Sequence, residues 1–180
     1  MRTVRFGDVV AAVSIVETDG VGDVDEVLMR LRDLAEGCEV QLFNPDLLVD
    51  WEHFDAVLTS AILSFKSGGS AKSLGLEFLT RLAATRQVSE AIAVAGVESW
   101  FKQVGILVLG GEYGRVAGAA QKILVAVGGT EVELAYTAER VQNVAMRYGV
   151  GWGPMTHIQA MDRLEAVKLA IIQRVATSII

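Results

Sequence analysis

The stretch VGILVLGG, residues 104–111, decides the fold of this chain. It is a continuous apolar run of strand length that ends in two glycines, which is typical of a buried strand. Helical patterns precede it over about 74–83 and 89–95, and another follows over about 113–127. A buried strand between helices predicts an α/β protein, in which helices pack on a central sheet.

The outer parts of the sequence supply further strands and helices. Residues 3–16 are β-branched and apolar, and predict either one long strand or a hairpin. The other predicted elements are strands over 38–43 and 130–136, helices within 23–37 and 51–67, a helix capped by Thr137, and a long helix over about 156–177. We therefore expect one domain over residues 1–180, of mixed α+β class. Its small, mostly antiparallel sheet is packed with a layer of helices, and its middle and C-terminal segments are helical.

The composition is that of a compact protein. Of the 180 residues, 52% are hydrophobic and only two are Pro. This hydrophobic fraction exceeds what a small monomer needs, which favours a partner-facing surface. No apolar run approaches the ~18 residues of a membrane span, and the first residues lack a signal-peptide pattern. We therefore expect a cytoplasmic protein with no membrane partner.

The few residues that could carry chemistry do not form a catalytic or metal site. His53 and His157 are far apart in the sequence, and neither has a second ligand at a recognisable spacing, so we expect structural or surface roles for both. Cys38 is the single cysteine and has no nearby His, so we expect a buried, unreactive thiol. We predict no enzyme, no metal and no cofactor.

The segment LVLGGEYGRVAGAAQK, residues 107–122, superficially resembles a dinucleotide-binding turn. Its glycines do not give G-x-G-x-x-G, and no acidic residue ends a following strand about 20 positions on. Turn geometry and close helix packing explain these glycines better. A metabolite-binding regulatory domain that uses the turn at Gly110–Gly118 stays open as an alternative function.

Charge is distributed unevenly along the chain, whose formal net charge is −6. Residues 1–63 hold four basic and thirteen acidic residues, a balance of −9, and residues 91–180 have a balance of +1. Between them, residues 64–90 have a balance of +2, from Lys66, Lys72, Arg81 and Arg86 against Glu77 and Glu90. An acidic protein with one short basic segment is not a non-specific nucleic-acid binder, but it can bind an anion locally.

Glu77 and Arg81 lie four residues apart on one predicted helix, in the order that favours an ion pair. One interpretation is an exposed ion pair worth under about 1 kcal/mol. The other is that Glu77 orients Arg81 toward a ligand. Backbone N–H groups that begin the helix after Gln87 would then converge with four side chains, as in sites for phosphates and single-stranded bases. Those side chains are Lys72, Ser73, Arg81 and Arg86.

The stretch LEFLTRLAATRQVSEAIAVAGV, residues 76–97, resembles the signature of the CGI/TPRKB family, the small accessory subunit of the KEOPS complex. The family pattern is E-x-x-x-R, a short turn, R-Q-I-x-x-A-I and a Gly. The matching positions are Glu77, Arg81, Arg86, Gln87, Val88, Ala91, Ile92 and Gly96. The resemblance covers about residues 38–177. The chain departs from the pattern at Ala84, where the family has Gly, and at Val88, where it has Ile. Residues 98–103 and 149–154 have no counterpart.

The resemblance implies a subunit that is not itself an enzyme. KEOPS makes N6-threonylcarbamoyladenosine at tRNA position 37, and this subunit binds the single-stranded 3′ CCA end of tRNA and the complex's small kinase/ATPase. Glu77 would orient Arg81 in the tRNA site. The implied tRNA-binding residues are Lys72, Ser73, Glu77, Arg81, Arg86, Gln87 and Val88.

The resemblance places the kinase-binding surface on the C-terminal helices. The last of them has more apolar positions than one buried stripe requires, which agrees with a partner. Two alternatives stay open: the helix is simply part of the core, or the chain is a scaffold that docks the kinase without binding tRNA. The residues assigned to the kinase are Leu164, Val167, Ile171 and Val175.

Overall fold

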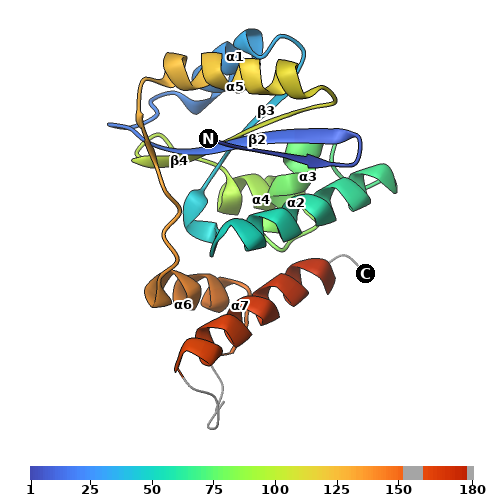
Figure 1. Ribbon diagram of the computed structural model, residues 1–180, viewed down its shortest axis with the longest axis vertical. Coiled ribbons are helices and arrows are strands. Elements are labelled where there is room, and N and C mark those ends of the chain that lie inside the picture. Colours follow the sequence, from blue (N-terminus) through green and yellow to red (C-terminus); the bar gives the residue numbers. More distant parts are fainter. Residues whose placement is uncertain (152–159, 178–180) are drawn as a thin grey trace.

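Five strands form one antiparallel sheet in the middle of the molecule (Figure 1). The computed structural model describes residues 1–151 and 160–177. In this part of the chain the order across the sheet is β1–β2–β4–β3, and β5 pairs with the last part of β2. The strands are β1 (Arg2–Phe6), β2 (Val9–Glu17), β3 (Glu39–Phe43), β4 (Gln103–Gly110) and β5 (Thr130–Val132).

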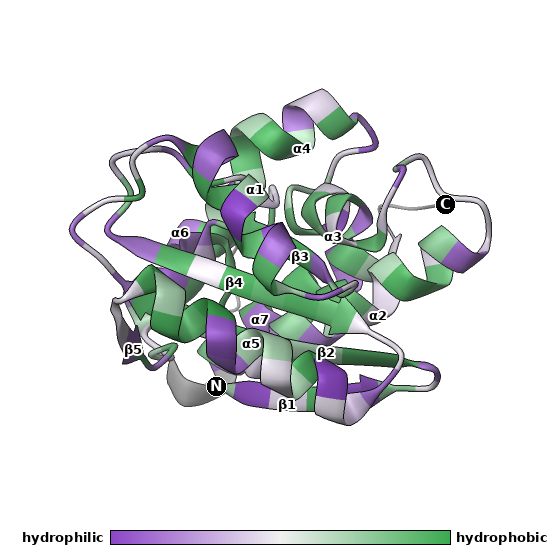
Figure 2. Ribbon diagram, turned by 90° about the horizontal axis from the view of Figure 1, so that it is seen from above, coloured by the Kyte–Doolittle hydropathy of each residue, from purple (hydrophilic) through white to green (hydrophobic). Residues whose placement is uncertain are grey.

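Residues 3–16 belong to a hairpin, the second of the two predicted alternatives. The turn between β1 and β2 contains Gly7, whose φ of +62° is a conformation that glycine adopts without strain. β2 and β4 are the central strands, and most of their residues are buried. Figure 2 shows both as largely hydrophobic ribbons, which is the expected pattern for strands covered on two faces.

One face of the sheet is covered by α1 (Val24–Leu34) and α5 (Tyr113–Val127) (Figure 1). The carboxylate of Asp23 caps α1 by accepting a hydrogen bond from the backbone N–H of Glu26. Leu31 of α1 and Ile123 of α5 are fully buried in a core that these helices share with β2, β3 and β4.

The opposite face is covered by α2 (Trp51–Lys66), α3 (Leu74–Leu82) and α4 (Val88–Ala95), which follow the short 3-10 helix η1 (Pro45–Leu47). Asp50 caps α2, because its carboxylate accepts a hydrogen bond of 2.8 Å from the N–H of His53. Phe54 of α2 and Phe78 of α3 lie in ring contact at 5.6 Å between centroids. These helices therefore bury their aromatic side chains against one another and the sheet.

Phe43 at the end of β3 needs space that only a glycine leaves. It lies opposite Gly105 of β4, and a Cβ atom at Gly105 would come 2.2 Å from the Phe43 ring. The ring also makes an edge-on contact with Phe78 at 5.3 Å. Gly105 thus allows Phe43 to join the sheet to α3.

A further helical layer lies outside α2, formed by α6 (Ala138–Arg147) and α7 (Ala160–Thr177) (Figure 1). Thr137 caps α6 as predicted, through a hydrogen bond from the Arg140 N–H to its hydroxyl. Val144 of α6 and Ile171 of α7 are fully buried in the same core as α2. The mixed α/β class and the mostly antiparallel sheet are confirmed.

Two details of the prediction differ from the structure or lie beyond it. The strand predicted over 130–136 is wrong after Val132, because the chain leaves the sheet there and buries Leu134 in the core shared with α6 and α7. The alternating pattern therefore reflects burial of Leu134 in this core and not a longer ladder. His157 and the predicted helix start at 156–159 lie outside the described residues. No helix in the described ranges has the length and apolarity that crossing a bilayer requires.

Candidate functional site

The two loops that flank α3 carry the exposed residues of the predicted site. The α2–α3 loop (residues 67–73) touches the α3–α4 loop (residues 83–87), because the Ser70 hydroxyl donates a hydrogen bond of 3.3 Å to the Arg86 carbonyl. Side chains from both loops are accessible at this junction, which we call the basic site. Its members are the exposed Lys72, Arg86 and Gln87 and the half-buried Ser73 and Val88.

The first turn of α4 has no side-chain cap at the basic site, although it carries the Glu90 carboxylate. Gln87 occupies the N-cap position, but in the described part of the chain it makes no side-chain capping hydrogen bond. Thr85 accepts a hydrogen bond of 3.2 Å from the Gln87 N–H and donates one of 2.6 Å to the Glu90 carboxylate. An uncapped helix start leaves N–H groups that an anion can accept, and Arg86 stands next to it.

The first turn of α3, by contrast, is already occupied. Ser73 caps Leu76, and the Glu39 carboxylate of β3 accepts a hydrogen bond of 2.6 Å from the Gly75 N–H. A phosphate at this helix start would be repelled by Glu39. Sequence reasoning missed this residue because Glu39 lies on a different strand, far from the motif.

Glu77 and Arg81 form a buried ion pair, which differs from both sequence interpretations. Their exposed fractions are 0% and 5%. The Nη2 of Arg81 donates to Glu77 Oε1 and to the Ser64 hydroxyl of α2, and Glu77 Oε2 accepts a hydrogen bond of 3.2 Å from the Ala71 N–H. The pattern of α3 alone predicts an exposed pair, whereas α2 and the α2–α3 loop cover this face of the helix. The bonded side of the guanidinium is therefore directed at α2 and not at solvent.

A cleft of about 690 Å³ lies beside this buried pair. Its walls are the outer side of α2, the first residues of the α2–α3 loop and the end of α7. Four hydroxyl side chains and the exposed Leu63 line it, with Ala176 on the α7 side. The hydroxyl residues are Thr59, Ser60, Ser64 and Ser67. The surface of the cleft is therefore mostly apolar with scattered hydroxyl groups, and Asp55 is the one charged side chain among its lining residues.

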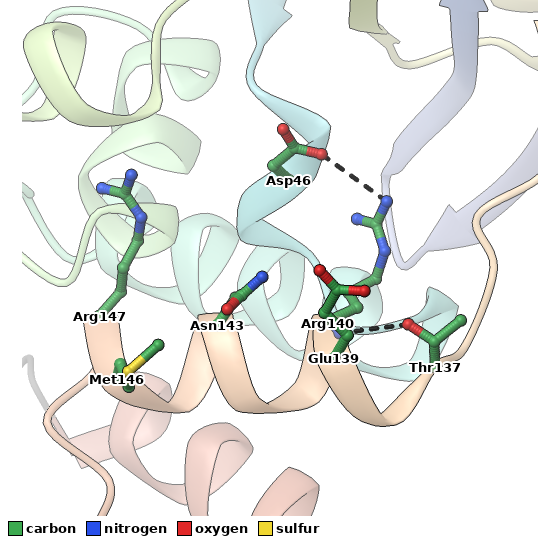
Figure 3. Close-up of a pocket in the computed structure, with 7 residues that line it drawn as sticks. All are labelled: Asp46, Thr137, Glu139, Arg140, Asn143, Met146 and Arg147. Carbon is green, nitrogen blue, oxygen red and sulfur yellow. Dashed lines mark hydrogen bonds and ion pairs between the residues drawn. The ribbon is translucent and has the colours of Figure 1, made fainter.

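A second cleft, of about 720 Å³, runs along α6 (Figure 3). Arg140 lies at one end and Arg147 at the other. Arg140 is engaged internally, because its Nη1 donates to the carbonyls of Pro45 and Leu48 at 2.8 and 3.1 Å. The cleft has charges of both signs and no buried ionisable side chain directed into it, so we assign it no chemistry.

The residues assigned to the kinase are mostly internal. Val167, Ile171 and Val175 are buried in the core between α7 and α2, and Leu164 is half-buried. They pack because α7 presents one stripe of apolar residues to α2, which is the alternative that the sequence left open. A partner could contact these three side chains only if α7 left α2.

The turn at Gly110–Gly118 is built for packing. A Cβ atom at Gly110 would lie 2.8 Å from Val116, so this glycine allows α5 to approach β4 closely. The Glu112 carboxylate accepts hydrogen bonds from the N–H groups of Gly114 and Arg115, at 3.0 and 3.3 Å. An acidic side chain occupies the place where a nucleotide phosphate would bind, which disfavours the metabolite-binding alternative.

His53 and Cys38 have the buried positions that were expected of structural residues. His53 Nδ1 accepts a hydrogen bond of 3.2 Å from the Val49 N–H, and burial lowers the pKa of His53 to about 4. Burial also raises the pKa of the Cys38 thiol above its ordinary value. Within residues 1–151 and 160–177, no three His, Cys, Asp or Glu side chains group as metal ligands would.

Comparison with known proteins adds no identity. Models of known protein families give no match to the chain, and a search of curated proteins gives none either. The function of the chain is therefore inferred from its own residues and from the resemblance of residues 76–97 to a family motif.

Proposed function

We propose that this chain is the non-catalytic subunit of a KEOPS-type complex, which binds the single-stranded 3′ CCA end of tRNA. The observation that carries the proposal is the basic site, where the loop that carries the exposed Lys72 touches the loop that carries the exposed Arg86 and Gln87 at the uncapped start of α4. Cationic side chains and free N–H groups beside small polar side chains suit a short stretch of phosphates and bases.

The charge distribution supports a short RNA end over a long duplex. Residues 1–63 have a balance of −9 and the whole chain a net charge of −6, so the molecule as a whole repels a polyanion. The start of α3 adds to this restriction, because Glu39 occupies it. A ligand confined to the basic site meets only one open helix start, and the three nucleotides of a CCA end are a suitable length.

We also propose, from the resemblance, that the small kinase of the complex is a protein partner. Its contacts would have to use the exposed sides of the C-terminal helices. Met146 of α6 and Leu169 of α7 are large apolar side chains that are exposed there. The charge changes Met146→Glu and Leu169→Glu test this docking without disturbing the buried stripe of α7. Unchanged co-purification with the kinase in both variants contradicts docking through these side chains.

The RNA proposal is tested by fluorescence anisotropy with a labelled tRNA acceptor minihelix that either ends in CCA or lacks these nucleotides. We expect tighter binding of the complete end, and we expect Arg86→Ala to weaken binding and to lower the slope of log Kd against log salt by about 0.7 for one lost phosphate contact. Lys122→Ala is the matched control, since Lys122 is an exposed lysine on α5 across the sheet. Equal affinity for both minihelices would overturn the proposal.

A further inference from the structure

We infer that the buried Glu77–Arg81 pair does not contact the ligand and instead positions the α2–α3 loop, so that Lys72 is held at the basic site. This inference rests on the proposed function and assigns the pair a role different from RNA contact. Its basis is that the pair, which belongs to α3, joins this helix to two other segments. Arg81 holds Ser64 of α2, Glu77 holds the backbone of Ala71, and both residues belong to α3.

The loop is held by hydrogen bonds at Gly69 and again at Ala71. The Gly69 N–H donates a hydrogen bond of 2.9 Å to the Ser64 carbonyl, and two residues later the Ala71 N–H donates to Glu77. Gly69 leaves no free space over the pair, because a Cβ atom there would lie 2.8 Å from the Ser64 hydroxyl and 2.9 Å from Glu77 Oε2. Lys72 follows directly after Ala71, so its backbone position depends on the Glu77 carboxylate.

A direct phosphate contact by Arg81 conflicts with this geometry. Arg81 is 5% exposed and its Nη2 bonds to both Glu77 and Ser64. If the guanidinium turned outward, Glu77 would be left as a fully buried carboxylate without its cation. The exposed cations of the basic site, Lys72 and Arg86, need no such rearrangement to reach a phosphate.

A double-mutant cycle between Lys72 and Arg81 distinguishes positioning from contact. The measurement is the affinity for the minihelix ending in CCA, with Lys72→Ala, Arg81→Met and the double variant, each checked by circular dichroism for its fold. We expect Lys72→Ala to weaken binding about fivefold in the native chain and less than about twofold in the Arg81→Met chain, because a released loop no longer presents Lys72. In the Arg81→Met chain, the slope of log Kd against log salt should fall by about 0.7, which corresponds to the loss of the single phosphate contact made by Lys72.

Milder variants keep the inference testable if Arg81→Met does not fold. Ser64→Ala removes one bond of the guanidinium, and Gly69→Ala presses a methyl group against Ser64 and Glu77. We expect both to reduce the effect of Lys72→Ala. Gly118→Ala is the matched control, because nothing lies within 4 Å of an added Cβ at this α5 position.

The outcomes separate this inference from the proposed function. Additive effects of Lys72→Ala and Arg81→Met overturn the inference, because they mean that Arg81 acts independently of the loop. If Arg86→Ala weakens binding while Lys72→Ala has no effect, the positioning role is also overturned, but the RNA site stands. If neither variant weakens binding, the proposed function fails together with the inference.

Discussion

The two ends of α2 both hold other segments of the chain, but they do so with different arrangements of charge. At the C-terminal end, the Ser64 hydroxyl accepts a hydrogen bond from Arg81, which is paired with Glu77, and both charged side chains are almost completely buried. At the N-terminal end, Lys168 of α7 meets three carboxylates, at 2.7 to 3.3 Å. These belong to Asp50, Glu52 and Glu165.

The difference is one of solvent access. Lys168 is nearly buried, but the Glu52 and Glu165 side chains are 64% and 49% exposed, so water stabilises much of their charge. Burial lowers the pKa of Lys168, yet hydrogen bonds to Glu165 and Glu52 and the charge of Asp50 outweigh it and hold the pKa above its ordinary value. The C-terminal end has no such solvent compensation. There, among the described residues, the charge of Glu77 is balanced only by the directly bonded Arg81.

The largest expected effect is at the C-terminal end. Arg81→Met leaves the fully buried Glu77 without its cation, and we expect it to lower the free energy of unfolding by about 3–5 kcal/mol. Urea unfolding measures this. The double variant Glu77→Leu with Arg81→Met removes both charges and should recover most of the loss. A loss below about 1 kcal/mol in Arg81→Met would contradict the burial of the pair.

The N-terminal end contains a neutral imidazole, which gives it a pH dependence. The pKa of His53 is about 4, against an ordinary value of 6.5, so below pH 6.5 the unfolded chain binds a proton that the folded chain does not. Stability is therefore present above pH 6.5 and is lost as the pH falls to 4, by roughly 3 kcal/mol.

The control for this prediction is His53→Asn, in which the amide oxygen can still accept from Val49 but does not titrate. The difference in unfolding free energy between the two chains, measured by urea at pH 7 and at pH 4, isolates the His53 contribution from that of the acids. An equal difference at the two pH values would show that His53 is not held neutral.

A smaller effect is expected from Lys168→Met. The three carboxylates lose their cation but two of them can hydrate, so we expect a loss of roughly 1–2 kcal/mol, between the values for exposed and buried pairs. Thermal unfolding measures it at neutral pH. Because the pKa of Lys168 is raised, its contribution is complete below about pH 10 and is lost only above that. Glu52 is the most exposed of the three carboxylates around Lys168, so Glu52→Gln should change the free energy of unfolding little.

The smallest effect is a gain at the loop beside the buried pair. Ala84 has a φ of +53°, a left-handed conformation that costs a residue with a Cβ atom about 1–2 kcal/mol. Ala84→Gly removes this strain but adds freedom to the unfolded chain, so we expect a net stabilisation of about 0.5–1 kcal/mol by urea unfolding. A loss of stability would mean that the Ala84 methyl group makes packing contacts worth more than the strain.

Most of the fold could be predicted from the sequence because its signals are local. The caps at Asp50 and Thr137 and the apolar periodicity of the helices depend on neighbours within one or two turns. The end of β5 could not be predicted, because Leu134 is buried in the core without belonging to the strand, and an alternating pattern does not distinguish the two cases.

The candidate site was only partly predictable for the same reason. Lys72, Arg86 and Gln87 are exposed at two adjoining loops, as a surface site requires. The burial of Arg81 and of the α7 stripe depends on α2, which lies before both in the sequence and covers them only in the folded chain. A helical pattern says which residues share a face, and says nothing about which other element covers that face.

The tethered α2–α3 loop also affects how fast and at what entropic cost a ligand binds. Because Ser64, Ala71 and Glu77 fix this loop in the folded chain, the conformational entropy of its residues is lost during folding and not during association. A ligand that binds on this loop meets a surface that needs no rearrangement, so its association rate is set by diffusion and charge. Selectivity among such ligands then appears in their dissociation rates.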